Sequence, residues 1–110
     1  MDTPAHYREL IQKILSDYAR IPYAHGDIRQ ETVFDTQRDH YLLVNVGWDG
    51  RRVHGCLVHV DLIDGKFWIQ RDGTEDGIAT ELEAAGVPKE HIVLAFHPAE
   101  VRPHTGYAVA

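Results

Sequence analysis

Two aspartate–glycine pairs, Asp49-Gly50 and Asp64-Gly65, constrain the fold more than any other feature of this sequence. Each pair separates two runs rich in β-branched and aromatic residues, and such pairs favour two-residue turns between antiparallel strands. The three runs cover residues 39–48, 51–63 and 66–71. Two hairpins in succession predict an antiparallel β-meander, and a more polar run at 28–35 predicts an edge strand before it.

A helix is predicted on each side of the meander. Residues 4–20 carry apolar side chains at helical spacing, with Thr3 as a possible cap and Pro4 at the first position. The predicted apolar stripe comprises Tyr7, Leu10, Ile11, Ile14, Leu15 and Tyr18. A second helix is expected to begin near Thr74 and to end at Gly86.

Short strands are expected at residues 92–96 and 107–109. The sequence thus predicts one α+β domain over residues 1–110. Its elements are an N-terminal helix, an antiparallel meander of about four strands, a second helix and one or two short strands. The length of 110 residues leaves little room for a second domain.

If both aspartate–glycine turns contain two residues, the alignment of the strands that they join follows. Val46 then lies opposite Val53, and Ile63 lies opposite Lys66. The polar residue His59 lies opposite both His40 and Gln70 on its two neighbouring strands, unless a β-bulge shifts the alignment. The face predicted to receive the helices carries Leu43, Cys56, Val58, Val60, Leu62, Phe67 and Ile69.

The opposite face is predicted to be apolar as well. It carries Leu42, Val44, Val46, Trp48, Leu57 and Trp68, followed by polar residues. A large apolar surface of this kind usually marks an interaction site. Two explanations stay open: the C-terminal segment covers this face, or another chain does. Trp48, Trp68 and the turn residues Asp35 and Arg38 are the candidate partner surface.

Charge and cysteine content narrow the classes of function. The formal net charge is −6, and Arg51-Arg52 is the only pair of adjacent basic residues. Direct binding to DNA is disfavoured, because DNA affinity comes largely from lysine and arginine. The single cysteine excludes an intrachain disulfide, and we expect a cytosolic protein because neither a signal peptide nor a membrane-spanning run is evident.

A polar cluster on the second face is the candidate functional site. Its predicted members are His40, His59, Asp61, Gln70 and Asp72. These residue types suit either structural hydrogen bonds or a metal, since zinc takes three or four converging nitrogen, sulfur or oxygen ligands. No known metal motif is present, so hydrogen bonding is the favoured interpretation. No catalytic residue, metal or cofactor is assigned from the sequence.

Long strings of this sequence resemble the XisI family of cyanobacterial proteins. The most specific are FDTQRDHY, VGWDG, WIQRDGTEDGIA and GVPKEHIVLAFHP, and the similarity extends over nearly the whole chain. The family is known as controlling factors for excision of the fdxN DNA element. The resemblance implies a role as an accessory factor beside a recombinase, together with a XisH-like protein partner.

Three functions are therefore weighed. The first is a non-enzymatic accessory protein that binds a XisH-like partner, and a homodimer through the same face is expected as well. The second is a metal-dependent or other small enzyme that uses His40, His59, Gln70 and Asp72. The third is a factor that contacts DNA directly. The acidic charge favours the first, because complementary charge assists association with a basic partner.

Overall fold

The computed structural model describes residues 4–21 and 26–110. Its helices and strands are α1 (Pro4–Ala19), β1 (Asp27–Asp35), β2 (His40–Trp48), β3 (Arg52–Ile63), β4 (Lys66–Asp72), α2 (Ile78–Ala84) and β5 (Ile92–Leu94). Two short 3₁₀ helices, η1 (Lys89–His91) and η2 (Arg102–His104), lie on either side of β5 along the chain. The predicted α+β class is confirmed. The predicted cap Thr3 lies outside the described residues.

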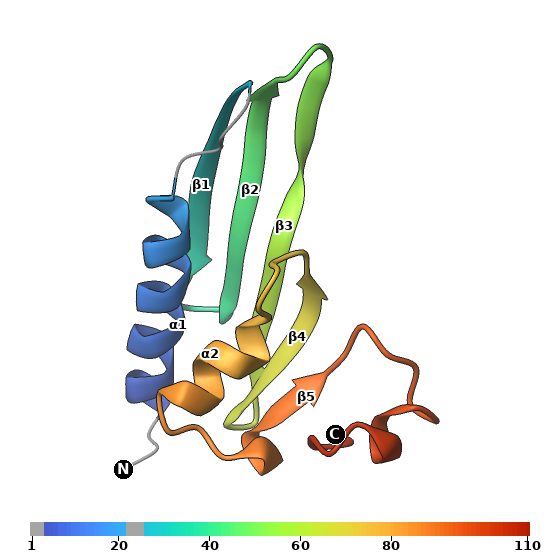
Figure 1. Cartoon of the computed structure of the whole chain (residues 1–110). Coiled ribbons are helices and arrows are strands. Elements are labelled where there is room, and N and C mark those ends of the chain that lie inside the picture. Colours follow the sequence, from blue (N-terminus) through green and yellow to red (C-terminus); the bar gives the residue numbers. More distant parts are fainter. Residues whose placement is uncertain (1–3, 22–25) are drawn as a thin grey trace.

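The strands form one sheet in the order β1-β2-β3-β4-β5. The first four make the predicted antiparallel meander, with β1 at one edge, and β5 joins β4 in parallel. Figure 1 shows α1 and α2 on the same side of the sheet, while the β2–β3 hairpin extends beyond both helices. The sheet therefore has one helix-covered face and one face turned away from the helices, here called the open face.

Helix α1 supplies much of the core. Its buried residues, Tyr7, Ile11, Ile14 and Leu15, belong to the predicted stripe. They pack with Tyr41, Leu43, Val58, Val60, Phe67 and Ile69 on the helix-covered face of the sheet. The apolar spacing of the sequence thus places this helix correctly, because burial of its stripe is the main source of its stability.

Helix α2 begins later than predicted, at Ile78 rather than near Thr74. The reason is an unexpected cap: a carboxylate oxygen of Asp72 accepts a hydrogen bond from the Ile78 N–H at 2.6 Å. The other Asp72 oxygen accepts from the N–H of Thr74 at 2.9 Å, so the segment between them folds as a turn. The predicted end is confirmed, because Gly86 has a φ of 95° and its N–H donates to Glu83 O.

The two aspartate–glycine turns differ. In Asp64-Gly65 both residues have positive φ, 51° and 77°, and Ile63 lies opposite Lys66 as predicted. In the first turn Gly50 has a φ of 71° but Asp49 is not in the left-handed region, and Arg51 is added to the loop. Such a three-residue loop is a common alternative to the two-residue turn.

The extra loop residue makes the predicted β2–β3 register wrong. Val46 lies opposite His54 instead of Val53. A β-bulge at Leu57 adds a further shift, so His40 lies opposite Asp61 instead of His59. As a result, Cys56 and Leu57 lie on the faces opposite to those predicted. Cys56 pairs with Val44 of the open face, and Leu57 packs against the core.

A second bulge lies in β4. Val60 pairs with Ile69 as predicted, but His59 pairs with Arg71 because Gln70 is the extra residue. The bulge also places Asp72 opposite the buried Val58, on the helix-covered face. Asp72 is therefore not a neighbour of the two histidines, contrary to the sequence prediction.

The C-terminal segment covers one end of the open face. The Arg102 guanidinium lies 5.5 Å from the centre of the Trp68 ring, and Ala108 forms a bridge with Val93 of β5. Trp48, at the other end of the same face, has 57% of its surface exposed. Within the described part of the chain, no helix has the length and hydropathy needed to cross a membrane.

Candidate functional site

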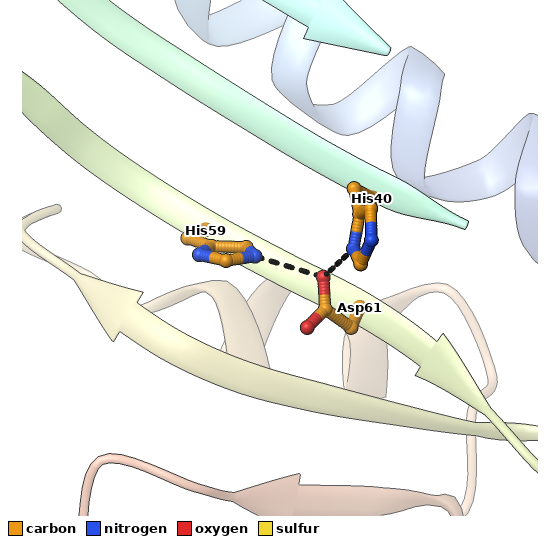
Figure 2. A group of neighbouring side chains, drawn as sticks. All are labelled: His40, His59 and Asp61. Carbon is orange, nitrogen blue, oxygen red and sulfur yellow. Dashed lines mark hydrogen bonds and ion pairs between the residues drawn. The ribbon is translucent and has the colours of Figure 1, made fainter. Parts of the chain in front are cut away.

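Two histidines converge on one carboxylate at the surface of the open face. His40 Nδ1 lies 2.7 Å from Asp61 Oδ1, and His59 Nε2 lies 2.8 Å from the same oxygen (Figure 2). Asp61 is buried, with 8% of its surface exposed. The side chains of His40 and His59 are 47% and 34% exposed, so solvent reaches both rings. The site is thus anchored in the sheet and open at its outer side.

Strand register creates this arrangement. His40 is the first residue of β2 and pairs directly with Asp61, and side chains of directly opposed residues lie on the same face. His59 precedes Asp61 by two residues on β3, which also places the two on one face. A cluster of three residues therefore needs only two adjacent strands, and the bulge at Leu57 sets which residues meet.

Gln70 completes the cluster from β4. Its Nε2 lies 3.3 Å from Asp61 Oδ2, the oxygen that the histidines leave free. The sequence predicted His40, His59, Asp61 and Gln70 as one group, and the structure brings these four together. The fifth predicted member, Asp72, instead caps α2 on the other side of the sheet. Aspartate commonly caps helices, but Asp72 lies six residues before Ile78, and Thr74, which is nearer to the helix, is also a typical capping residue.

A second polar junction lies next to the cluster. The Arg8 guanidinium on α1 donates to both Asp39 oxygens, at 2.7 and 3.2 Å, and the Tyr41 hydroxyl donates to Asp39 Oδ1 at 2.8 Å. The hydrogen bond from Arg8 holds the pKa of Asp39 below its usual range. Asp39 has a φ of 59°, so it lies in the turn rather than in the strand predicted to start there. This ion pair fixes α1 to the start of β2.

The candidate partner residues do not form one patch. Asp35 pairs with His40 at one end of β2, and Trp48 is the last residue at the other end. At a rise of about 3.3 Å per residue, eight residues separate these ends by about 26 Å. Trp68 is half-buried beneath Arg102, and Arg38 is exposed in the turn after Asp35. Trp48 is thus the most accessible aromatic residue of the predicted surface.

One surface feature was not predicted. A groove of about 490 Å³ runs between α1 and α2. Its walls include the apolar Leu10, Ile14 and Ile21 and the acidic Asp17, Asp76 and Glu81. The groove lies on the helices rather than on the open face, and sequence patterns did not reveal it because it depends on how the two helices are placed relative to each other.

Comparison with known proteins identifies the family. The model of the family described as XisI protein matches residues 1–109. The chain belongs to the XisI family. No match is found among curated proteins. The resemblance inferred from the sequence strings is therefore confirmed over essentially the whole chain.

Two solved XisI structures have the same fold. A XisI-like protein from Anabaena variabilis is 39% identical, with a TM-score of 0.90, over 98% of this chain and 100% of that chain. The fdxN element excision controlling factor XisI from the same organism is 35% identical, with a TM-score of 0.82, over 97% and 98% of the two chains. The XisI architecture thus extends over the whole described domain, including the strands that carry the histidine cluster.

Proposed function

We propose that this chain is an accessory protein that controls programmed site-specific DNA excision by binding a protein partner of the XisH type. The observation that carries the proposal is full-length similarity to the fdxN element excision controlling factor XisI, at 35% identity over 97% of this chain. An accessory role needs a recognition surface rather than a reaction centre. The open face provides the features of such a surface.

The charge of the chain supports a protein partner over DNA. A formal net charge of −6 repels a polyanion but attracts a basic, DNA-acting protein. Complementary charge raises the association rate and helps to set the orientation of the bound partner. Direct contact with DNA is therefore assigned to the partner.

The Trp48 end of the open face is the proposed contact surface. Leu42, Val44 and Val46 form an apolar row of half-buried residues along β2, and Trp48 ends this row with 57% of its surface exposed. The Arg52 guanidinium lies over the Trp48 ring, 5.3 Å from its centre. Tryptophan and arginine are enriched at the energetically dominant positions of interfaces. The hairpin also extends beyond the helices, which leaves it accessible to another chain (Figure 1).

Co-expression with the XisH-like protein tests the proposal. The two chains should co-purify at low salt, and Trp48→Ser should weaken binding by about tenfold or more, the effect of losing a central aromatic contact. Binding is measured by calorimetry on the separately purified chains. Failure of two well-folded chains to associate at low salt would contradict a role through this partner.

Ile21→Ser is the matched control. Ile21 is 59% exposed, close to the value for Trp48, but it lines the groove between the helices. Binding should survive this change. If Ile21→Ser abolished binding and Trp48→Ser did not, the partner would contact the groove, and the open face would be the wrong surface.

Self-association is the competing use of the open face. A homodimer through this face would compete with the partner for Trp48. Light scattering of the chain alone, with wild type and Trp48→Ser compared, measures the oligomer directly. A dimer that Trp48→Ser converts to a monomer would place a second copy of the chain on this face.

A further inference from the structure

The histidine cluster has the composition of a metal site as well as that of a hydrogen-bond network. His40, His59 and Asp61 each offer one ligand atom, and these atoms all lie within 4.8 Å of one another. The two rings meet nearly edge-on, with an interplanar angle of 78°, so they do not stack. Figure 2 shows one nitrogen of each ring directed at the same Asp61 oxygen.

The distances are close to those that a tetrahedral ion requires. Zinc binds imidazole nitrogen and carboxylate oxygen at about 2.0–2.2 Å, which separates neighbouring ligand atoms by about 3.3 Å. The two nitrogen–oxygen distances here are 2.7 and 2.8 Å. An outward movement of about half an ångström by each ring would admit an ion, and both rings have space to move because they are partly exposed to solvent.

The surroundings also suit a cation. Asp61 pairs with the two histidines, and no lysine or arginine of the described residues forms an ion pair with it. Gln70 holds the second Asp61 oxygen at 3.3 Å and so orients the carboxylate, as outer-shell residues do around metal ligands. The solvent-exposed side of the rings leaves a fourth coordination position for water.

We propose that His40 Nδ1, His59 Nε2 and an Asp61 oxygen bind one divalent transition-metal ion of the zinc class. Two imidazole nitrogens and one carboxylate oxygen suit zinc, nickel or cobalt, whereas magnesium and calcium require sites made of oxygen ligands. The proposal goes beyond the accessory function and does not depend on it, since it concerns the other end of the open face from Trp48.

Zinc titration of the untagged, chelator-treated chain tests the site. Calorimetry should give one ion per chain, and the melting temperature should rise with zinc because the ion binds the folded state. Cobalt, used as a spectroscopic probe, should give the visible absorption bands of a four-coordinate site. A melting temperature that zinc leaves unchanged, with no saturable heat of binding, would overturn the proposal.

Amide substitutions distinguish metal binding by the two histidines from their hydrogen bonding. His40→Asn and His59→Gln keep an N–H donor close to the position of each ligand nitrogen, so the hydrogen bonds to Asp61 and the fold should persist. The amide nitrogen cannot bind a metal, so zinc binding and the cobalt bands should be lost. Binding that survives both substitutions would show that the ion sits elsewhere and that the cluster is structural.

Two further variants complete the test. Gln70→Ala should weaken zinc binding by about 10- to 100-fold while keeping one ion per chain, the effect expected of an outer-shell residue. His54→Gln is the control, because His54 is an exposed histidine on the same strand, opposite Val46. Zinc binding that depends on His54 as strongly as on His59 would indicate adventitious surface binding and contradict the proposed site.

Discussion

The two faces of the sheet use the same strands but differ in what covers them. On the helix-covered face, Leu43 and Val60 are fully buried and belong to one core with residues of α1 and α2. On the open face, Leu42 and Val44 stay half-buried, and the C-terminal segment reaches only the Trp68 end. From this difference we expect stability to depend mainly on the helix-covered face, which leaves the open face available for the proposed recognition and ligand binding.

The largest expected effect comes from the helix-covered face. Leu43→Ala should lower the free energy of unfolding by about 2–5 kcal/mol, because it leaves a cavity in a closely packed core. Val44→Ala, one residue later on the open face, should cost about 1 kcal/mol or less. Denaturant unfolding of both variants measures the contrast. Equal losses would mean that the open face is as tightly packed as the core.

The next largest loss of stability is expected at Asp39, because its side chain joins α1 to the sheet. Asp39→Asn should cost about 1–2 kcal/mol at pH 7, the value of charged hydrogen bonds with Arg8 and Tyr41. Asparagine tolerates the left-handed backbone at this position nearly as well as aspartate, so the change isolates the charge.

The pH dependence of that loss has a definite sign. The pKa of Asp39 is lowered by the hydrogen bond from Arg8. The stabilisation of the folded state by ionised Asp39 is therefore complete above the ordinary carboxyl pKa of about 4. It disappears as the pH falls through the lower pKa of the folded state. The stability difference between wild type and Asp39→Asn should therefore shrink below pH 4. A difference that stays constant down to pH 2 would contradict the ion pair.

A smaller effect is expected where the C-terminal segment meets the open face. Arg102 donates through Nε to His97 O at 3.1 Å and covers Trp68. Arg102→Leu should cost about 1 kcal/mol and should speed hydrogen exchange at Ala108, whose N–H donates to Ile92 O. Arg52→Leu, which removes the guanidinium above the exposed Trp48, should leave exchange at Ala108 unchanged.

The smallest effect is expected at Trp48 itself. Because its side chain is mostly exposed, Trp48→Ser should change the free energy of unfolding by no more than about 0.5 kcal/mol. Thermal and denaturant unfolding measure this directly. A loss above 2 kcal/mol would show that Trp48 supports the fold, and its use as a partner contact would then need a different test.

Local patterns account for the elements that the sequence predicted correctly. The helical spacing of Tyr7, Ile11 and Leu15 specified α1, and Gly86 specified the end of α2. The Asp64-Gly65 pair specified its turn because both residues tolerate positive φ. Four members of the candidate cluster were also predicted, since alternation along a strand fixes the face of each side chain over short distances.

The errors arise where distant contacts override the local pattern. The extra loop residue Arg51 and the bulge at Leu57 together changed the neighbour of His40 from His59 to Asp61. The bulge at Gln70 turned Asp72 toward α2, where its carboxylate caps the helix. Neither bulge has a local sequence signal such as glycine at the bulged position, so the extra residue in each strand could not be predicted from the sequence.

The amino-acid sequence by itself determined the α+β class, the order of the elements and the membership in the XisI family. It also determined the two apolar faces, because hydrophobic periodicity follows from the geometry of one helix or one strand. Only the tertiary structure decided which face the helices cover, which histidine nitrogens meet at Asp61, and which tryptophan stays exposed. Those outcomes depend on strand register and on the packing of segments far apart in the chain, and both are set by the total burial of the folded domain rather than by any short stretch of residues.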